Sequence, residues 1–87
     1  MFSPTNAIIL GSAMRAGRAA LGWSQQQLAE NSLVSLPTIA RIETGLISPR
    51  LQTISRLITA MEEAGVVFAW ADPANDFSMT VSFSKKR

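Results

Sequence analysis

Residues 36–42 combine an apolar stripe with side chains that can bind groups outside the protein. Ile39 and Ile42 are spaced to share the buried face of a helix, which turns Leu36, Thr38 and Arg41 outward. A guanidinium carries a planar fork of donors that fits guanine O6 and N7, or a phosphate. Threonine can bind a phosphate or a base, and leucine can contact a thymine methyl group. The segment is therefore suited to DNA. If Arg41 contacted phosphate alone, it would give affinity without sequence choice.

Two serines stand where side chains cap helices. Ser24 precedes three glutamines and an apolar pair, and Ser35 precedes Pro37 in a first helical turn. Gln25 would open the first of these helices, where backbone and side-chain amides can meet a phosphate. The alternative is a good helix former on a solvated face. Pro37 is predicted to start its helix rather than to contact a base.

The composition disfavours catalysis and metal binding. The chain has no histidine, cysteine or tyrosine, and its six carboxylates are scattered along the sequence rather than paired. No glycine motif that cradles phosphate is visible. We therefore expect no catalytic residue, no metal site, no disulfide and no cofactor.

Positive charge is concentrated in the first part of the chain. Residues 1–61 hold five arginines and two glutamates, a net charge of +3, whereas residues 62–87 have a net charge of −1. No apolar run reaches the roughly 18 residues that span a membrane. The start lacks the basic region of a secretory signal. The sequence thus predicts a mildly basic cytoplasmic protein of bacterial or phage origin, without a membrane partner.

Apolar residues at helical spacing predict four helices, near residues 5–20, 25–31, 36–44 and 49–64. In the last helix, Ser48 is the expected N-cap and Pro49 the first helical residue. The predicted buried face of the first helix holds Leu10, Ala13, Met14, Gly17 and Leu21. That of the last helix holds Leu51, Ile54, Leu57, Ile58 and Met61.

After Gly65 the period changes to that of β-strands. Residues 66–71, VVFAWA, form a continuous apolar run, and in residues 77–84 apolar side chains alternate with serine and threonine. This predicts a hairpin whose first strand is covered on both faces and whose second is covered on one. The predicted fold class is mainly α: a compact four-helix domain over residues 1–65, with a C-terminal β-hairpin and a basic tail over 66–87.

Residues 22–50 resemble the helix-turn-helix of the phage Cro/repressor family, the XRE-type regulators, and the resemblance covers about residues 10–64. The matching residues are Trp23-Ser24-Gln25, Leu28-Ala29-Glu30, Val34-Ser35, Pro37-Thr38-Ile39, Arg41-Ile42-Glu43, Gly45 and Ser48-Pro49. The resemblance implies a repressor-like domain whose helix over residues 36–44 enters the major groove. It also implies that Arg18 pairs with Glu43 inside the protein. The DNA-binding residues that it implies are Ser24, Gln25, Ser35, Leu36, Pro37, Thr38, Arg41 and Arg50.

One residue departs from the family pattern. The turn between the second and third helices carries Leu33 where the family usually has glycine, which suits a positive φ. Either Leu33 is strained, or Asn31 or Ser32 absorbs the bend and the turn follows another path.

The hairpin is predicted to form a homodimer interface, because a lone two-stranded hairpin is marginal in water and a symmetric partner would cover its apolar face. The interface residues would be Val67, Phe68, Trp70, Phe77, Met79, Val81 and Phe83. The alternative is a hairpin folded back on its own helices.

The function predicted from these features is that of a dimeric, sequence-specific repressor that binds a double-stranded DNA operator. A phage repressor, a restriction–modification controller and a toxin–antitoxin antitoxin all fit, and the antitoxin would add a toxin as partner. A protein-interaction module that reuses the fold without binding DNA is the alternative of a different class.

Overall fold

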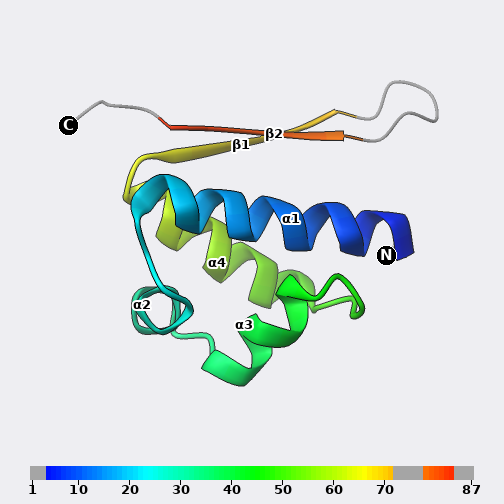
Figure 1. Ribbon diagram of the computed structural model, residues 1–87, viewed down its shortest axis with the longest axis horizontal. Coiled ribbons are helices and arrows are strands. Elements are labelled where there is room, and N and C mark those ends of the chain that lie inside the picture. The colour runs from blue at the N-terminus through cyan, green and yellow to red at the C-terminus, as the bar shows by residue number, and fades with distance from the viewer. Residues whose placement is uncertain (1–3, 72–77, 84–87) are drawn as a thin grey trace.

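The computed structural model describes residues 4–71 and 78–83. Four helices are followed by two strands (Figure 1): α1 (Pro4–Leu21), α2 (Gln25–Ser32), α3 (Leu36–Glu43), α4 (Leu51–Glu63), β1 (Val66–Ala71) and β2 (Ser78–Phe83). The predicted fold, four helices with a C-terminal hairpin, is confirmed. No described helix is both long and apolar enough to cross a membrane.

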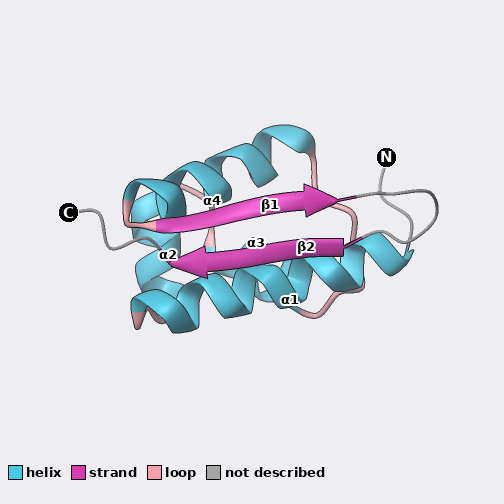
Figure 2. Cartoon of the chain, turned by 90° about the horizontal axis from the view of Figure 1, so that it is seen from above, coloured by secondary structure: helices cyan, strands magenta, loops and turns pink. Residues whose placement is uncertain are grey.

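The hairpin lies on one side of α1 and α4, and the pair α2 and α3 lies on the other (Figure 1). Seen from above, β1 runs along α4 and β2 runs along α1 (Figure 2), and each strand packs against that helix. The strands are antiparallel, with Val66 opposite Phe83 and Phe68 opposite Val81. The hairpin is thus folded back on its own helices, the alternative to a face covered by a partner.

A single core joins the helices to the hairpin. The largest fully buried side chains are Leu10, Met14, Leu28, Ile39, Ile42, Leu57, Met61 and Val66. Phe68 and Val81 are half-buried and pack against this core. Burial of each large apolar side chain contributes about 1.5–3 kcal/mol to folding. The core therefore depends on the hairpin as well as on the helices.

Two glycines allow α1 to approach its neighbours closely. A Cβ on Gly11 would lie 2.8 Å from the Ile42 carbonyl oxygen and 3.3 Å from that of Glu43. A Cβ on Gly17 would lie 2.7 Å from Met61 Sδ and 3.0 Å from the Phe68 ring. Any side chain at Gly11 would push α1 away from the end of α3.

Helix α4 begins later than predicted. Its N-cap is Arg50, without a side-chain capping bond, and its first residue is Leu51, so Ser48 and Pro49 lie before the helix. Pro49 is buried, and the chain stays extended through Arg50 at φ −69° and ψ 152° before it turns. Leu51 is 79% exposed, so the prediction that it belongs to the buried face of the helix is also wrong. The first turn of α4 projects beyond the core that Ile54 and Leu57 enter.

The first strand is covered on one face rather than two. Val66 is fully buried and Phe68 half-buried, whereas Val67 and Ala69 are exposed. The prediction failed because it assumed a second layer above the hairpin, and no described element packs there.

The turn between α2 and α3 contains the one non-glycine residue of the described chain with a positive φ. Leu33 has φ 62° and ψ 27°, and its N–H donates to the Ala29 carbonyl at 3.0 Å, which ends α2. Ser32 is buried, and its hydroxyl accepts from the Val34 N–H at 3.2 Å. The bend is therefore absorbed by Leu33 itself, the first of the two predicted paths.

Leu33→Gly should stabilise the fold by about 1 kcal/mol, because glycine adopts the left-handed region without a Cβ clash. The melting temperature of a chain this small should rise by roughly 4–8 °C. Leu33→Ala is the matched control: it removes the exposed side chain but keeps the Cβ, so its stability should change by less than about 0.5 kcal/mol. Thermal unfolding followed by circular dichroism measures both. Equal melting temperatures for the two variants would show that the turn is unstrained.

Candidate DNA interface

The helices α2 and α3 both begin at a serine that caps them, as predicted. The Ser24 hydroxyl accepts from the Gln27 N–H at 3.0 Å, and the Gln27 side-chain oxygen accepts from the Ser24 N–H at 2.8 Å. The Ser35 hydroxyl accepts from the Thr38 N–H at 3.3 Å and donates to the Thr38 hydroxyl at 2.8 Å. Neither helix has an acidic residue in its first turn. Neither first turn therefore carries a negative side chain of its own that would oppose a phosphate.

The outer face of α3 carries the side chains expected to contact DNA. Leu36, Pro37 and Arg41 are exposed and Thr38 is half-buried, while Ile39 and Ile42 fix the opposite face in the core. Within the described part of the chain, the Arg41 guanidinium makes no hydrogen bond or ion pair. Its five donors are thus available to a ligand.

Arg50 is exposed at the start of α4. It follows the loop that leaves α3, and its side chain makes no capping bond. A cation at this position, between α3 and α4, is suited to binding a phosphate.

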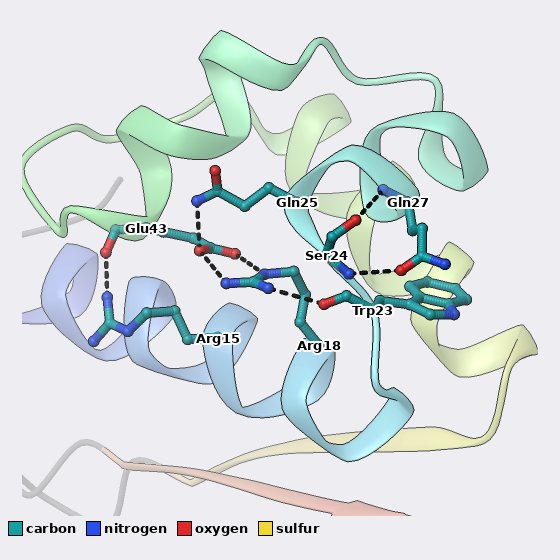
Figure 3. A network of polar contacts seen from close by, with 7 residues as sticks. All are labelled: Arg15, Arg18, Trp23, Ser24, Gln25, Gln27 and Glu43. Carbon is teal, nitrogen blue, oxygen red and sulfur yellow. Dashed lines mark hydrogen bonds and ion pairs between the residues drawn. The ribbon is translucent and has the colours of Figure 1, made fainter.

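The C-terminal end of α3 is held by a buried carboxylate (Figure 3). Arg18 donates from Nε to Glu43 Oε2 at 2.8 Å and from Nη2 to Glu43 Oε1 at 2.9 Å, a bidentate pair. The Glu43 side chain is 4% exposed and that of Arg18 is 20% exposed. Arg18 Nη1 also donates to the Trp23 carbonyl at 2.9 Å. The structure thus brings together the two residues that the family resemblance paired. Through these bonds Arg18 connects α1 to α3 and to Trp23, which comes just before α2.

The pKa of Arg18 is raised above its usual value, first by its hydrogen bonds with Glu43 and then by the nearby negative charge, against an opposing effect of burial. An arginine side chain is protonated at ordinary pH, and the raised pKa extends the range in which the Arg18 guanidinium stays charged. The charge of Arg18 is therefore a fixed part of the fold, and it would be lost only in strongly alkaline solution.

Two further side chains reach Glu43, and sequence reasoning assigned neither to it. Gln25 Nε2 donates to Glu43 Oε1 at 2.9 Å, so in the free protein this side chain binds the carboxylate rather than pointing into solvent. Arg15 donates to the Glu43 main-chain carbonyl and, at 3.1 Å, to the Ser12 hydroxyl. The position of Arg15, three residues before Arg18 on the same helical face, was the signal that could have indicated its contact.

The predicted interface residues of the hairpin lie in different surroundings. Phe68 and Val81 face the core, whereas Val67 and Phe83 are exposed. Trp70 and Met79 are paired in the strand register, and Phe77 lies outside the described residues.

The order of the elements, with two capped helices joined by a tight turn and the second presenting an outward arginine, is that of a helix-turn-helix. The family model of helix-turn-helix domains matches residues 14–63, more than half of the chain. The chain belongs to the XRE family of helix-turn-helix proteins. This is a DNA-binding regulatory family and not a family of enzymes. A comparison with curated proteins found no match.

The ion pair of this XRE-family protein can be tested by a double-mutant cycle. Arg18→Met should cost about 3 kcal/mol or more, because it leaves a buried carboxylate without its main partner. Glu43→Gln should cost less, because Arg18 is partly exposed and keeps the Trp23 carbonyl. The double variant should recover part of the combined loss, with a coupling of about 0.5–3 kcal/mol. Urea unfolding of the four proteins measures the cycle, and strictly additive losses would contradict the interaction.

Proposed function

We propose that this XRE-family protein is a sequence-specific double-stranded DNA-binding regulator, acting as a dimeric repressor that recognises the major groove with α3. The observation that carries the proposal is that α3 has one face buried in the core and one face exposed. Ile39 and Ile42 anchor it in the core and Glu43 holds its end, so Arg41 extends from a rigid element. A rigid helix with an unengaged arginine suits recognition of a fixed base pattern.

The roles of the contact residues follow from their places on the two helices. Arg41 would bind guanine O6 and N7, with Thr38 and Leu36 on neighbouring bases. Amides at the start of α2 and α3, beside Ser24 and Ser35, would bind phosphates. Arg50 would bind the phosphate backbone beyond α3, and Gln25 would do so only after leaving Glu43. Pro37 would preset the first turn of α3.

Repression requires that the bound protein occupies an operator for long enough to exclude other proteins. The antitoxin alternative keeps the same DNA contacts and adds a protein partner. The interaction-module alternative predicts no DNA binding at all, so a measurement of DNA affinity separates it from the proposed function.

Arg41→Ala should remove discrimination at one base pair of each half-site, a loss of about 1–3 kcal/mol. The operator would be selected from random double-stranded DNA, and affinities would be measured by fluorescence anisotropy against operator and unrelated DNA. Arg56→Ala is the matched control, since it removes the same charge from an exposed position on α4. If Arg41→Ala and Arg56→Ala have the same ratio of specific to nonspecific affinity, Arg41 does not recognise a base.

The positions of the hairpin and of α2 and α3 favour one arrangement of the two copies in the dimer. The hairpin and the pair α2 and α3 lie on opposite sides of the molecule (Figure 1). A face-to-face contact between two hairpins would therefore turn the two α3 helices in opposite directions. An antiparallel contact between two β2 strands, about an axis perpendicular to the sheet, keeps both α3 helices on one side, as a two-fold operator requires.

The free side of β2 supports this arrangement. Within the described sheet β2 has one neighbour, β1, so its other edge carries unpaired backbone groups. A mainly apolar hollow of about 310 Å³ lies between α1 and β2, lined by Ile8, Ile9, Ser12, Ala13, Ala16 and Val81. We propose that a second copy pairs along the β2 edge and covers this hollow. Two large apolar side chains of the described hairpin are exposed, Phe83 on β2 and Val67 on β1.

Ile8→Glu should therefore convert the dimer to a monomer, because the partner would have to bury an unpaired charge. Ile8 is 57% exposed, so the fold itself tolerates the change. Gln52→Glu adds the same charge at an exposed position on α4 and should remain dimeric. Sedimentation equilibrium of the three full chains measures this. An Ile8→Glu protein that sediments like the wild type would exclude the α1–β2 interface.

A further inference from the structure

We propose that Leu33 is a specificity-determining residue that contacts a thymine methyl group at the edge of each operator half-site. The proposal rests on the proposed DNA-binding function and adds to it a contact from the turn before the recognition helix. It also assigns a preference, for a methyl-bearing base at that position.

The side chain of Leu33 contributes little to the fold. It is 82% exposed, so it buries almost none of its apolar surface against the protein. The structural contact that Leu33 makes is its main-chain N–H to the Ala29 carbonyl at 3.0 Å, and glycine would keep that bond. Nothing in the described packing therefore needs a leucine side chain here.

The backbone at Leu33 makes the choice of leucine unfavourable for folding. Its φ of 62° lies in the left-handed region, where a Cβ is strained and glycine is not. A strained residue with an unburied side chain indicates a role outside the fold. The compensating contact must come from a molecule that the protein binds.

The place of Leu33 identifies that molecule. Leu33 comes three residues before Leu36, which is also exposed, and between them Ser35 caps α3. The N-terminal end of a recognition helix is the part that contacts base edges, so Leu33 continues the interface of α3.

The chemistry of this end of α3 is mainly apolar. Pro37 is exposed beside Leu36, and the hydroxyls of Ser35 and Thr38 bind each other at 2.8 Å. The apolar group that a base presents in the major groove is the C5 methyl of thymine. Leu33 and Leu36 are thus suited to recognise methyl groups rather than hydrogen-bonding atoms.

The experiment uses the operator selected from random DNA by the wild-type chain. Each thymine is replaced in turn by deoxyuridine, which removes the methyl group alone, and affinities are measured for wild type, Leu33→Gly and Leu33→Ala. At one thymine per half-site the wild type should lose about fourfold in affinity, the value of one buried methyl group. Both variants should bind the unmodified operator about fourfold or more weakly, and should lose nothing further on that substitution.

The controls separate the contact from stability and from general apolarity. Leu33→Gly is expected to melt higher than the wild type, so its weaker binding cannot come from unfolding. Leu46→Ala removes a leucine that is 83% exposed and follows the C-terminal end of α3, and it should retain the methyl dependence. Wild-type affinity at Leu33→Gly, or loss of methyl dependence in Leu46→Ala, would overturn the assignment of Leu33. A wild-type chain that enriches no sequence from the pool would instead overturn the proposed function, and the Leu33 contact with it.

Discussion

The arrangement of the helix-turn-helix depends on one buried carboxylate. Glu43 ends α3, and its side chain accepts from Arg18 on α1 and from Gln25 at the start of α2, while its main-chain carbonyl accepts from Arg15. An ionised group buried this deeply would destabilise the fold if its partners were absent. The bonds to Glu43 therefore hold α1, α2 and α3 in their relative arrangement, and so hold the orientation of α3. Gly11 also constrains the position of α1, because the absence of a Cβ lets its backbone lie close to the carbonyl groups at the end of α3.

Much of this fold and candidate site could be predicted from the sequence, because the signals are local. Capping serines, the spacing of Ile39 and Ile42 and the glycine after α3 each act within a few residues, so their geometry follows from the chain alone. The pairing of Arg18 with Glu43 came from the family resemblance, since no local pattern joins residues so far apart. Where reasoning from local pattern failed, the deciding interaction was tertiary: Pro49 is buried before α4 rather than placed in it, and no element of the described chain covers Val67.

The contacts of Gln25 show a further limit of sequence reasoning. A glutamine at the start of a helix suits a phosphate, a carboxylate or water equally well, and only the fold brings Glu43 within 2.9 Å of it. The path of the turn at Leu33 was open for a related reason. Asn31 and Ser32 have the side chains that usually adapt to such a bend, yet Asn31 bonds the Gln27 carbonyl and Ser32 the Val34 N–H, both within α2 or next to it.

The burial of Val66 has a consequence for how the protein is made. Synthesis releases α1 before the hairpin, yet part of the apolar surface of α1 packs against β1 and β2, and the Phe68 ring lies beside Gly17. The helices that hold the recognition surface therefore cannot close their core on the ribosome until the hairpin has emerged. Contacts between segments that are far apart in the sequence also slow the search for the native topology. The arrangement of α2 and α3 is thus linked to synthesis of the hairpin, so a chain interrupted before β2 would present an open apolar surface to proteases.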